Sequence, residues 1–466
     1  MAQIPHRSAD PESDRAPSQA GRGRRMPEWA PPLLALLIFA QIGWGGANQG
    51  VSSALAACAD ALLAIVVIGT SPAASRFWHQ ARVPVGWFVA ALVWGALPIL
   101  LPDGLARALD IPVNPAADMA VLALAKALGT TLLLITAALL AYSGGSAAVI
   151  TRWLAFAALL LLLYAAADAV DWLYDSARNA RYGGTIGNPN AAGITFAVIA
   201  LLTGGLTLAP PGAESFAMRL VGMAGAAAAL ILGAMTGSRS AMLLALILGG
   251  MMLFRRLRRW QDGRPSLRRL VPGVVVLVAV AATIAFLTPV GDRSAYLPED
   301  AGSRWAVIVH FAAIASQQPL WGHGLGSFFD VNQHTLNPDT APLYWNFGAA
   351  HNAPVQVALE TGWVGLALLL AGFAALLWRI ARARRDWWAV PALCGAGAIA
   401  GSAMVDIALN VPAVAGLFAV LLGSVWGAAM APGAMSMTRR IKPKRKAHRH
   451  RRSAHDVDQP VVETAV

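Results

Sequence analysis

The chain has 466 residues, of which 57% are hydrophobic and only 13% are charged, and its mean hydropathy is +0.56. Soluble globular proteins carry about 25% charged residues, so this composition excludes an ordinary soluble domain and predicts an all-α polytopic membrane protein. The formal net charge is +12, but the basic residues lie in short connections between apolar runs and in the two tails. This distribution indicates a membrane protein with positive cytoplasmic loops and no nucleic-acid partner.

Apolar runs of about 17–25 residues recur along the whole chain, and each is long enough to cross a bilayer as a helix. We expect twelve transmembrane helices, at residues 31–47, 52–70, 84–101, 117–141, 149–167, 190–208, 217–235, 239–254, 270–288, 363–379, 388–407 and 412–430. With the N-terminus inside, every arginine-rich connection lies on the cytoplasmic side. This agreement between span count and charge supports the predicted topology.

The spans divide the chain into five segments. Residues 1–29 form a cytoplasmic disordered tail, and residues 431–466 form a basic cytoplasmic disordered tail that we expect to lie on anionic membrane lipids. RNA binding by the basic tail is the alternative. Residues 30–288 hold helices one to nine, residues 289–362 form one large periplasmic loop with short active-site helices, and residues 363–430 hold the last three helices.

The connection after the fifth span carries the stretch "ARNARYGGTIGNPNAAG". Arg178 and Arg181 add positive charge to an outer face on which the topology predicts little. Asn188 and Asn190 flank a proline in a turn that we expect to cap the sixth span. We interpret Arg181, Asn188 and Asn190 as supporting residues of a site, and a purely structural turn is the alternative.

Arg239, in "MTGSRSAML", lies at the outer edge of a span and has no acidic neighbour in the sequence. An arginine at the centre of a span costs about 2.5–3.5 kcal/mol on insertion scales, and less toward the interface. Its guanidinium either reaches lipid headgroups or projects into an outward cavity. In a cavity it could bind phosphate through a bidentate fork.

The large loop contains the stretch "AGSRWAVIVHFAAIASQQP", which predicts an amphipathic helix lying along the membrane surface. Ser303 is the expected N-cap, and Pro319 lies just beyond the expected end. Arg304 would then lie in the first turn, where a cation opposes the helix dipole. This local cost indicates a functional role, although Glu299 or Asp300 could neutralise the charge.

The stretch "AHNAPVQVALETGWVGL" comes directly before the tenth span. Asn352 is expected to cap a helix that begins at Ala353, and Gly362 to end or bend that helix. His351 would lie at the helix N-terminus, where the dipole disfavours an imidazolium ion and attracts anions. A neutral imidazole beside an anion site can act as a general base. A surface histidine beside a capped helix is the alternative.

Residues at four-residue spacing divide that helix into two stripes. Asn352, Gln356 and Glu360 form a polar stripe, which we interpret as support for His351 or for a substrate. The apolar stripe beside it consists of Val355, Leu359 and Trp363.

Cofactor signatures are absent from the sequence. It contains no Walker loop, no dinucleotide-binding fingerprint and no plausible cluster of metal ligands, and Cys58 and Cys394 both lie in apolar runs. We therefore expect neither a cofactor nor a metal. Arginines and a histidine on one face fit an anionic substrate that carries its own leaving group, such as a lipid pyrophosphate. A transporter is an alternative, but its charges would lie near the bilayer midplane in broken, repeated helices, and no internal repeat is visible.

Five motifs occur in the order seen in the O-antigen ligase (WaaL-like) family of the Wzy C-terminal superfamily. They are "GGTIGNPNAAG", "TGSRSA", "SRWAV", "GHGLGSFFDV" and "AHNAPVQVALETGWVGL". The chain resembles this family over roughly residues 180–380. Each motif alone is weak, whereas five in order between membrane spans are specific.

This resemblance implies a metal-independent, inverting glycosyltransferase of the GT-C type in the bacterial inner membrane. Such an enzyme transfers glycan from undecaprenyl pyrophosphate to a lipid A-core acceptor on the periplasmic side. The resemblance also implies that His351 activates the acceptor hydroxyl and that Arg239 and Arg304 bind the donor pyrophosphate. Pro354 departs from the family pattern, in which a bulkier residue often follows the HN motif.

O-antigen or exopolysaccharide polymerases and protein O-oligosaccharyltransferases share these motifs and differ in their acceptor. Polymerases often have a second sizeable outer loop, so the single large loop of this chain favours the ligase. That preference rests on analogy within the superfamily.

Overall fold

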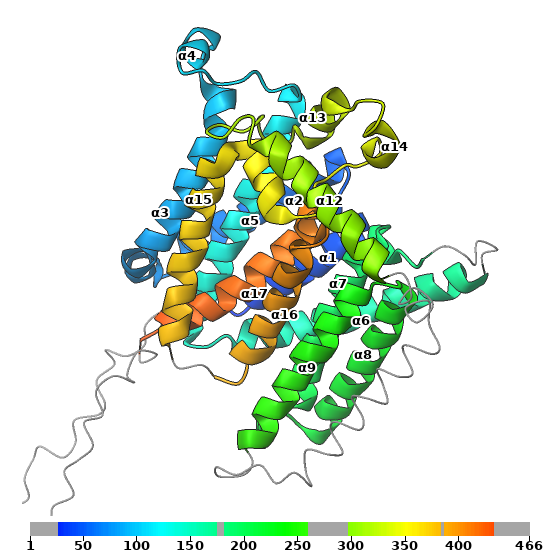
Figure 1. The fold of residues 1–466 in the computed structure, drawn as a ribbon. Coiled ribbons are helices and arrows are strands. Elements are labelled where there is room, and N and C mark those ends of the chain that lie inside the picture. Colours follow the sequence, from blue (N-terminus) through cyan, green and yellow to red (C-terminus); the bar gives the residue numbers. More distant parts are fainter. Residues whose placement is uncertain (1–26, 175–180, 260–296, 384–385, 433–466) are drawn as a thin grey trace, which may run out of the picture.

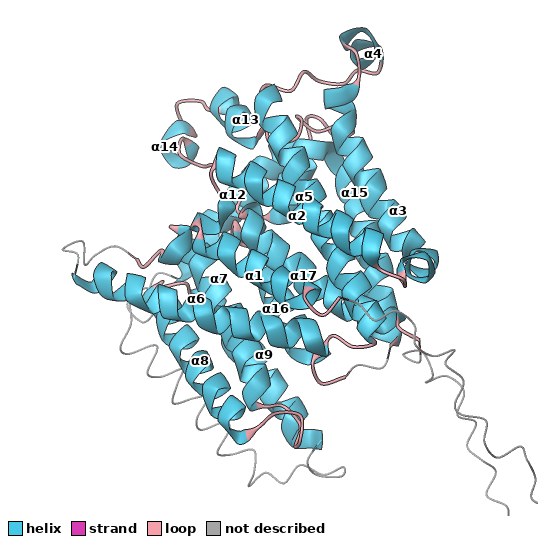
Figure 2. Ribbon diagram, turned by 180° about the vertical axis from the view of Figure 1, so that it is seen from behind, coloured by secondary structure: helices cyan, strands magenta, loops and turns pink. Residues whose placement is uncertain are grey.

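The computed structural model describes residues 27–174, 181–259, 297–383 and 386–432. Figures 1 and 2 show that the regular elements of these ranges are helices, which confirms the predicted all-α fold. The longer helices are α1 (Ala30–Gly43), α2 (Gly50–Thr70), α3 (Ala74–Leu100), α5 (Ala117–Gly144), α6 (Ala148–Tyr174), α7 (Pro189–Thr207), α8 (Phe216–Met235), α9 (Arg239–Arg259), α12 (Leu297–Ala315), α15 (Ala353–Arg382), α16 (Ala389–Ala403) and α17 (Pro412–Met430).

Nine helices of the described ranges are long and apolar enough to cross a membrane, so the protein is a polytopic all-α membrane protein. These are α2, α3, α5, α6, α7, α8, α9, α15 and α17. Two other predicted spans correspond to α1 and α16, which have only 14 and 15 residues. The predicted span 270–288 lies outside the described residues.

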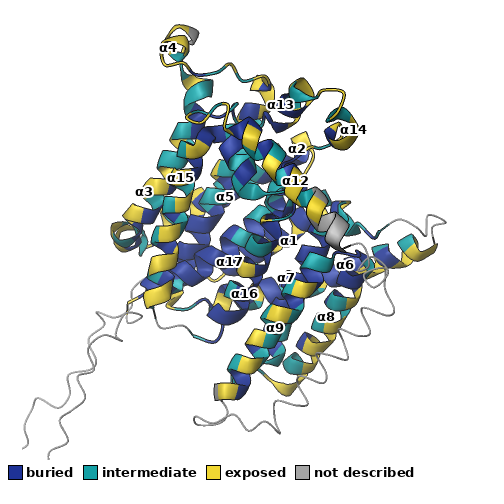
Figure 3. Ribbon diagram, in the orientation of Figure 1, coloured by how far each residue is buried: buried dark blue, intermediate teal, exposed yellow. Residues whose placement is uncertain are grey.

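The centre of the helix bundle is formed by α7 and α17. In their apolar stretches, 83% and 89% of the residues are buried within the protein, compared with 22% in α3. Figure 3 shows the same contrast between dark central helices and exposed outer ones. Helix α17 packs closely on α5, because a Cβ atom at Gly427 would lie 1.9 Å from the carbonyl oxygen of Ala138. Such small residues let helix backbones approach each other in a membrane.

Short helices gather at one end of the bundle (Figure 1). They are α4 (Asp103–Ala108), α13 (Phe328–Thr335) and α14 (Ala341–Tyr344), and α12 lies beside the last two. Phe311 of α12, Phe328 of α13 and Tyr344 of α14 pack with Leu359 of α15 in a second, smaller hydrophobic core. This core holds the first turns of α15 against α12.

The start of α12 differs from the prediction. The helix begins at Leu297, so Ser303 lies within the helix and is not its N-cap, and Arg304 lies in the third turn. The proposed penalty from the helix dipole therefore does not apply, because that effect falls off beyond the first turn. The polar residues before Ser303 obscured the true start of the helix in the sequence.

Helix α15 begins at Ala353 and bends at Gly362, as predicted. The Asn352 side chain accepts a hydrogen bond from the Val355 N–H group, and Gly362 has the non-helical angles φ 73° and ψ 172°. The predicted apolar stripe is only partly correct. Leu359 is fully buried, whereas Trp363 is 40% exposed, because the bend changes the face that the next turn presents.

Candidate functional site

His351 lies in the turn directly before α15. Its φ angle is +53°, a left-handed conformation that is uncommon for a residue other than glycine. Its ring packs edge-on against Phe347, with a centroid distance of 5.1 Å. The neighbouring Asn352 caps α15 and also donates a hydrogen bond of 2.8 Å to the Met404 carbonyl. These contacts fix the position of the imidazole between α15 and the α16–α17 connection.

A buried carboxylate joins His351 to Arg304. Asp406 lies in the connection between α16 and α17, and its side chain is 1% exposed. Its Oδ1 atom is 3.9 Å from Nδ1 of His351, and its Oδ2 atom is 3.7 Å from Nη1 of Arg304. Arg304 also donates a hydrogen bond of 2.8 Å to the Val405 carbonyl. We call the set formed by His351, Arg304 and Asp406 the polar junction.

The protonation state of His351 depends on three influences. Burial lowers its pKa most strongly, the Asp406 carboxylate raises it, and the positive charge of Arg304 lowers it again, so that the net pKa is below the ordinary value of 6.5. The imidazole is therefore neutral at neutral pH, and the contact with Asp406 is not an ion pair. The direction agrees with the expectation from the sequence, but burial is the main cause.

A second polar cluster lies where α7 and α9 begin. Arg181 donates hydrogen bonds to the Thr236 carbonyl at 2.7 Å and to the Asn190 side chain at 2.5 Å. Asn188 caps α7 as predicted, because its side chain accepts hydrogen bonds from the N–H groups of the second and third helical residues. These contacts favour a structural role for Arg181, Asn188 and Asn190. Arg178 lies outside the described residues.

Arg239 is the first residue of α9 and is half-buried. It follows the α8–α9 turn, whose Ser238 packs against α7 so closely that a Cβ at Gly193 would lie 2.6 Å from it. Figure 1 shows this turn at the upper ends of α7, α8 and α9, the ends nearer to α12. The short helix η4 (Ala408–Asn410), which follows Asp406, contacts α7. The α16–α17 connection, which carries Asp406, therefore also contacts the helix that begins in the second cluster.

The predicted polar stripe of α15 is present as a set of hydrogen bonds. The Gln356 amide donates to Glu360 Oε1 at 2.5 Å and accepts from the Ala350 N–H group at 2.8 Å. Glu360 Oε2 accepts from the Gly326 N–H group at 3.0 Å. The stripe therefore connects the residue before His351 with the segment between α12 and α13.

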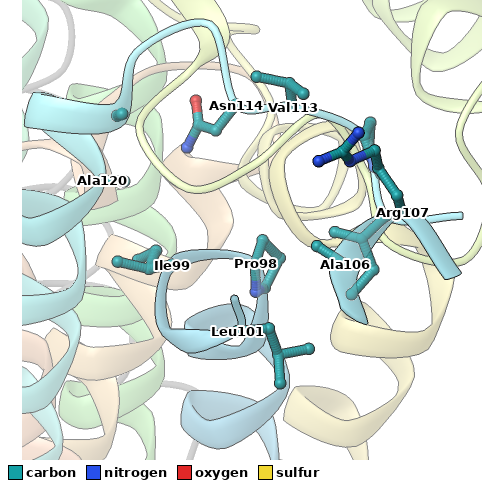
Figure 4. A pocket seen from close by; sticks show the side chains of 11 residues that line it. Pro98, Ile99, Leu101, Ala106, Arg107, Val113, Asn114 and Ala120 are labelled. Atoms are coloured by element: carbon teal, nitrogen blue, oxygen red, sulfur yellow. The ribbon is translucent and has the colours of Figure 1, made fainter. Parts of the chain in front are cut away.

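A pocket of about 460 Å³ lies at the same end of the bundle, between the end of α3, helix α4 and the start of α5 (Figure 4). Its lining is mostly apolar, with Arg107 and Asn114 as the polar members. The Asn114 side chain donates a hydrogen bond of 3.0 Å to the Leu325 carbonyl, so the pocket wall touches the α12–α13 segment. None of the three junction residues lines this pocket.

Asp406 is the site residue that the sequence analysis missed. It is the lone carboxylate in the apolar stretch "GSAMVDIALNVP", and an ionisable residue at the end of a span is costly unless it has a partner. That principle could have identified it. The sequence analysis considered Glu299 and Asp300 as partners of Arg304, whereas the carboxylate beside the guanidinium is Asp406. Within the described ranges, no three metal-ligating side chains lie close enough together to hold a metal ion.

The fold and the junction define a polytopic helical membrane protein whose candidate site lies at one end of the bundle. A family model described as O-antigen ligase matches residues 224–370, a segment that includes Arg239, Arg304 and His351. This match confirms the resemblance seen in the motifs and supports the O-antigen ligase/polymerase superfamily, whose members are in general glycosyl-transfer enzymes. The chain matches no protein among those with curated functions.

Proposed function

We propose that this protein is an O-antigen ligase of the bacterial inner membrane. It transfers polysaccharide from undecaprenyl pyrophosphate to a lipid A-core acceptor on the periplasmic side, as a metal-independent, inverting GT-C glycosyltransferase. The observation that carries this proposal is the polar junction, in which a neutral histidine from the turn before α15, an arginine of α12 and a buried carboxylate of the α16–α17 connection meet. The family match on the same residues supports it.

His351 acts as the general base in this reaction. The acceptor hydroxyl oxygen attacks the anomeric carbon and forms the new glycosidic bond, while the bond from that carbon to the pyrophosphate breaks and its electron pair leaves with the phosphate. The hydroxyl proton passes to the imidazole. Because Nδ1 faces Asp406, the neutral tautomer with a proton on Nδ1 leaves Nε2 as the basic nitrogen. The carboxylate then stabilises the imidazolium ion that forms.

Arg304 binds the donor pyrophosphate and balances its growing negative charge. Among the described residues, its contacts with Asp406 and Val405 both use Nη1. Its Nε and Nη2 atoms form the edge that can bind phosphate through two parallel hydrogen bonds. Arg239, at the start of α9, contributes a second positive charge to the same substrate.

The ligase differs from the other enzymes of its superfamily in the acceptor that it uses. A polymerase or a protein O-oligosaccharyltransferase would use the same junction for a growing glycan or a protein hydroxyl. A lipid or solute transporter is disfavoured because the junction lies at the end of the bundle, whereas transporter sites lie near the bilayer midplane.

Deletion of the gene is expected to remove long polymer from the lipid A-core and to cause lipid-linked polymer to accumulate. Both species can be measured by gel electrophoresis of lipopolysaccharide and mass spectrometry of the lipid-linked pool, with a complemented strain as control. Short single units still attached to the core would identify a polymerase instead. Unchanged lipopolysaccharide together with loss of a protein-linked glycan would identify the protein transferase.

Asp406→Asn is expected to move the acid limb of the pH–rate profile to lower pH. The carboxylate raises the pKa of His351, so its neutralisation lowers that pKa further, and the imidazole then stays basic in more acidic solution. The rate on the plateau falls, because the imidazolium ion loses its counter-charge. Transfer rates measured between about pH 5 and 8 in membranes test this shift. Asp339→Asn, a change at an exposed carboxylate near α14, is the matched control, and an equal shift in both variants would contradict the assignment.

A further inference from the structure

The bend of α15 at Gly362 is held by the segment that leads from α12 to α13. A break in a helix leaves backbone groups without their helical partners. Here the Leu359 and Glu360 carbonyls accept hydrogen bonds from the N–H groups of His323 and Gly324 at 2.8 and 3.0 Å, and Trp363 N–H donates to the Pro319 carbonyl at 2.8 Å. The segment 319–324 therefore supplies the partners that the bend removes.

Glycine is required at the points of closest contact. Gly322 has a φ of +70°, and a Cβ atom there would lie 2.5 Å from the backbone nitrogen of Gly362. A Cβ at Gly362 would lie 2.1 Å from the Leu320 carbonyl oxygen. Side chains at either position would separate the two backbones, so the segment and the bend form one rigid unit.

Side chains extend this unit to the residue next to His351. Gly326 N–H donates to Glu360 Oε2, Gln356 Nε2 donates to Glu360 Oε1, and Ala350 N–H donates to Gln356 Oε1. Lys126 of α5 interacts electrostatically with the Glu360 carboxylate. The series ends at Ala350, directly before the left-handed His351. A strained backbone conformation persists only where its surroundings fix it.

We propose that Glu360 is a positioning residue for His351. Through Gln356 it connects the glycine-containing segment 322–326 to the N–H group of Ala350, and so fixes the turn that directs the imidazole toward Asp406. The role of His351 in transfer rests on the proposed function, whereas the positioning itself does not. The direction of each hydrogen bond requires a carboxylate at position 360 and an amide at position 356.

Each single exchange of these groups removes one hydrogen bond. In Glu360→Gln an amide NH₂ group faces the donor of Gly326 or of Gln356, and in Gln356→Glu two carboxylates face each other. We expect kcat for glycan transfer to fall by about 10-fold to 100-fold in either variant, since a small misplacement of a catalytic group costs this much. KM for the lipid-linked donor should change little, because neither group contacts the proposed donor site.

The double variant Gln356→Glu/Glu360→Gln restores all three hydrogen bonds and keeps the net charge. The new carboxylate at position 356 would accept from Ala350 N–H with one oxygen and from the new amide at position 360 with the other. The oxygen of that amide would accept from Gly326 N–H. We expect the double variant to recover most of the kcat that each single variant loses. Gln317→Glu, which adds a carboxylate at an exposed position at the end of α12, should behave as the unchanged protein.

Acylation of His351 by diethyl pyrocarbonate, followed by mass spectrometry, measures the position of the ring without any transfer assay. We expect the half-buried imidazole to react several-fold faster in both single variants and at the original rate in the double variant. Absence of transfer by the unchanged protein would reject the proposed function, while this series would still test the positioning. The inference would be overturned if the single variants kept the kcat and the acylation rate of the unchanged protein. It would also be overturned if the double variant recovered neither quantity relative to the single variants.

Discussion

Replacement of His351 by alanine is expected to abolish glycan transfer while the protein still inserts in the membrane and binds its lipid-linked donor. A positioned base contributes about 10²–10⁴-fold to a proton-transfer step, and we propose that Arg239 and Arg304 bind the donor. The imidazole is suited to this role because burial keeps it neutral and Asp406 lies 3.9 Å from its Nδ1 atom. Transfer and donor binding measured on the same membranes would separate the two effects.

His351→Gln is the sharper variant of this test. Glutamine retains a hydrogen-bonding side chain of similar reach but has no basic nitrogen, so it should be as inactive as alanine. Transfer by this variant at near the original rate would reduce His351 to a residue that only orients the acceptor. The departure of the pyrophosphate would then drive the reaction without a base.

Arg304→Lys is expected to lower transfer by about 10²–10³-fold, the loss typical when one group that stabilises developing charge is removed. Lysine keeps the positive charge near Asp406 but cannot present two parallel N–H groups to a phosphate. The protein should therefore accumulate normally. Arg304→Ala is harder to interpret, because it also removes the positive charge beside the buried Asp406 carboxylate and so destabilises the fold.

Arg239→Lys and Arg239→Ala provide the comparison in the second cluster. If Arg239 also binds pyrophosphate through a fork, both variants should lose transfer to a similar degree and should raise KM for the lipid-linked donor. Full activity in Arg239→Ala would show that this guanidinium contacts lipid headgroups or neighbouring backbone only. Membrane insertion, measured by detergent extraction and gel filtration, is the control for all four variants.

Local features of the site could be read from the sequence. The cap by Asn352 depends on an N–H group three residues further on, and the bend at Gly362 depends on a positive φ angle that glycine readily adopts. Both features were correctly predicted. The link between Gln356 and Glu360 follows from four-residue spacing on one helix. For the cap and for the Gln356–Glu360 link, the partner of the polar group lies about one helical turn away, so spacing alone identifies it.

Contacts between distant segments could not be read in this way. Val405, which accepts a hydrogen bond from Arg304, is 101 residues away in the sequence. Asp406 follows an apolar run, and no motif near it in the sequence indicates which residues it contacts. The exposure of Trp363 likewise follows from a bend whose direction the segment 319–324 determines.

The order in which α5, Asp406 and α17 are synthesised has a consequence for biosynthesis. Helix α5 is synthesised well before α17. Gly423 and Gly427 of α17 lie closely against the Leu134 and Ala138 carbonyls of α5. The close packing of these two helices can therefore form only after α17 has entered the bilayer. The α16–α17 connection also supplies Asp406, the carboxylate beside His351. The polar junction is thus complete only after the α16–α17 connection has been made, so under the proposed function a nascent chain is not yet able to consume its lipid-linked donor.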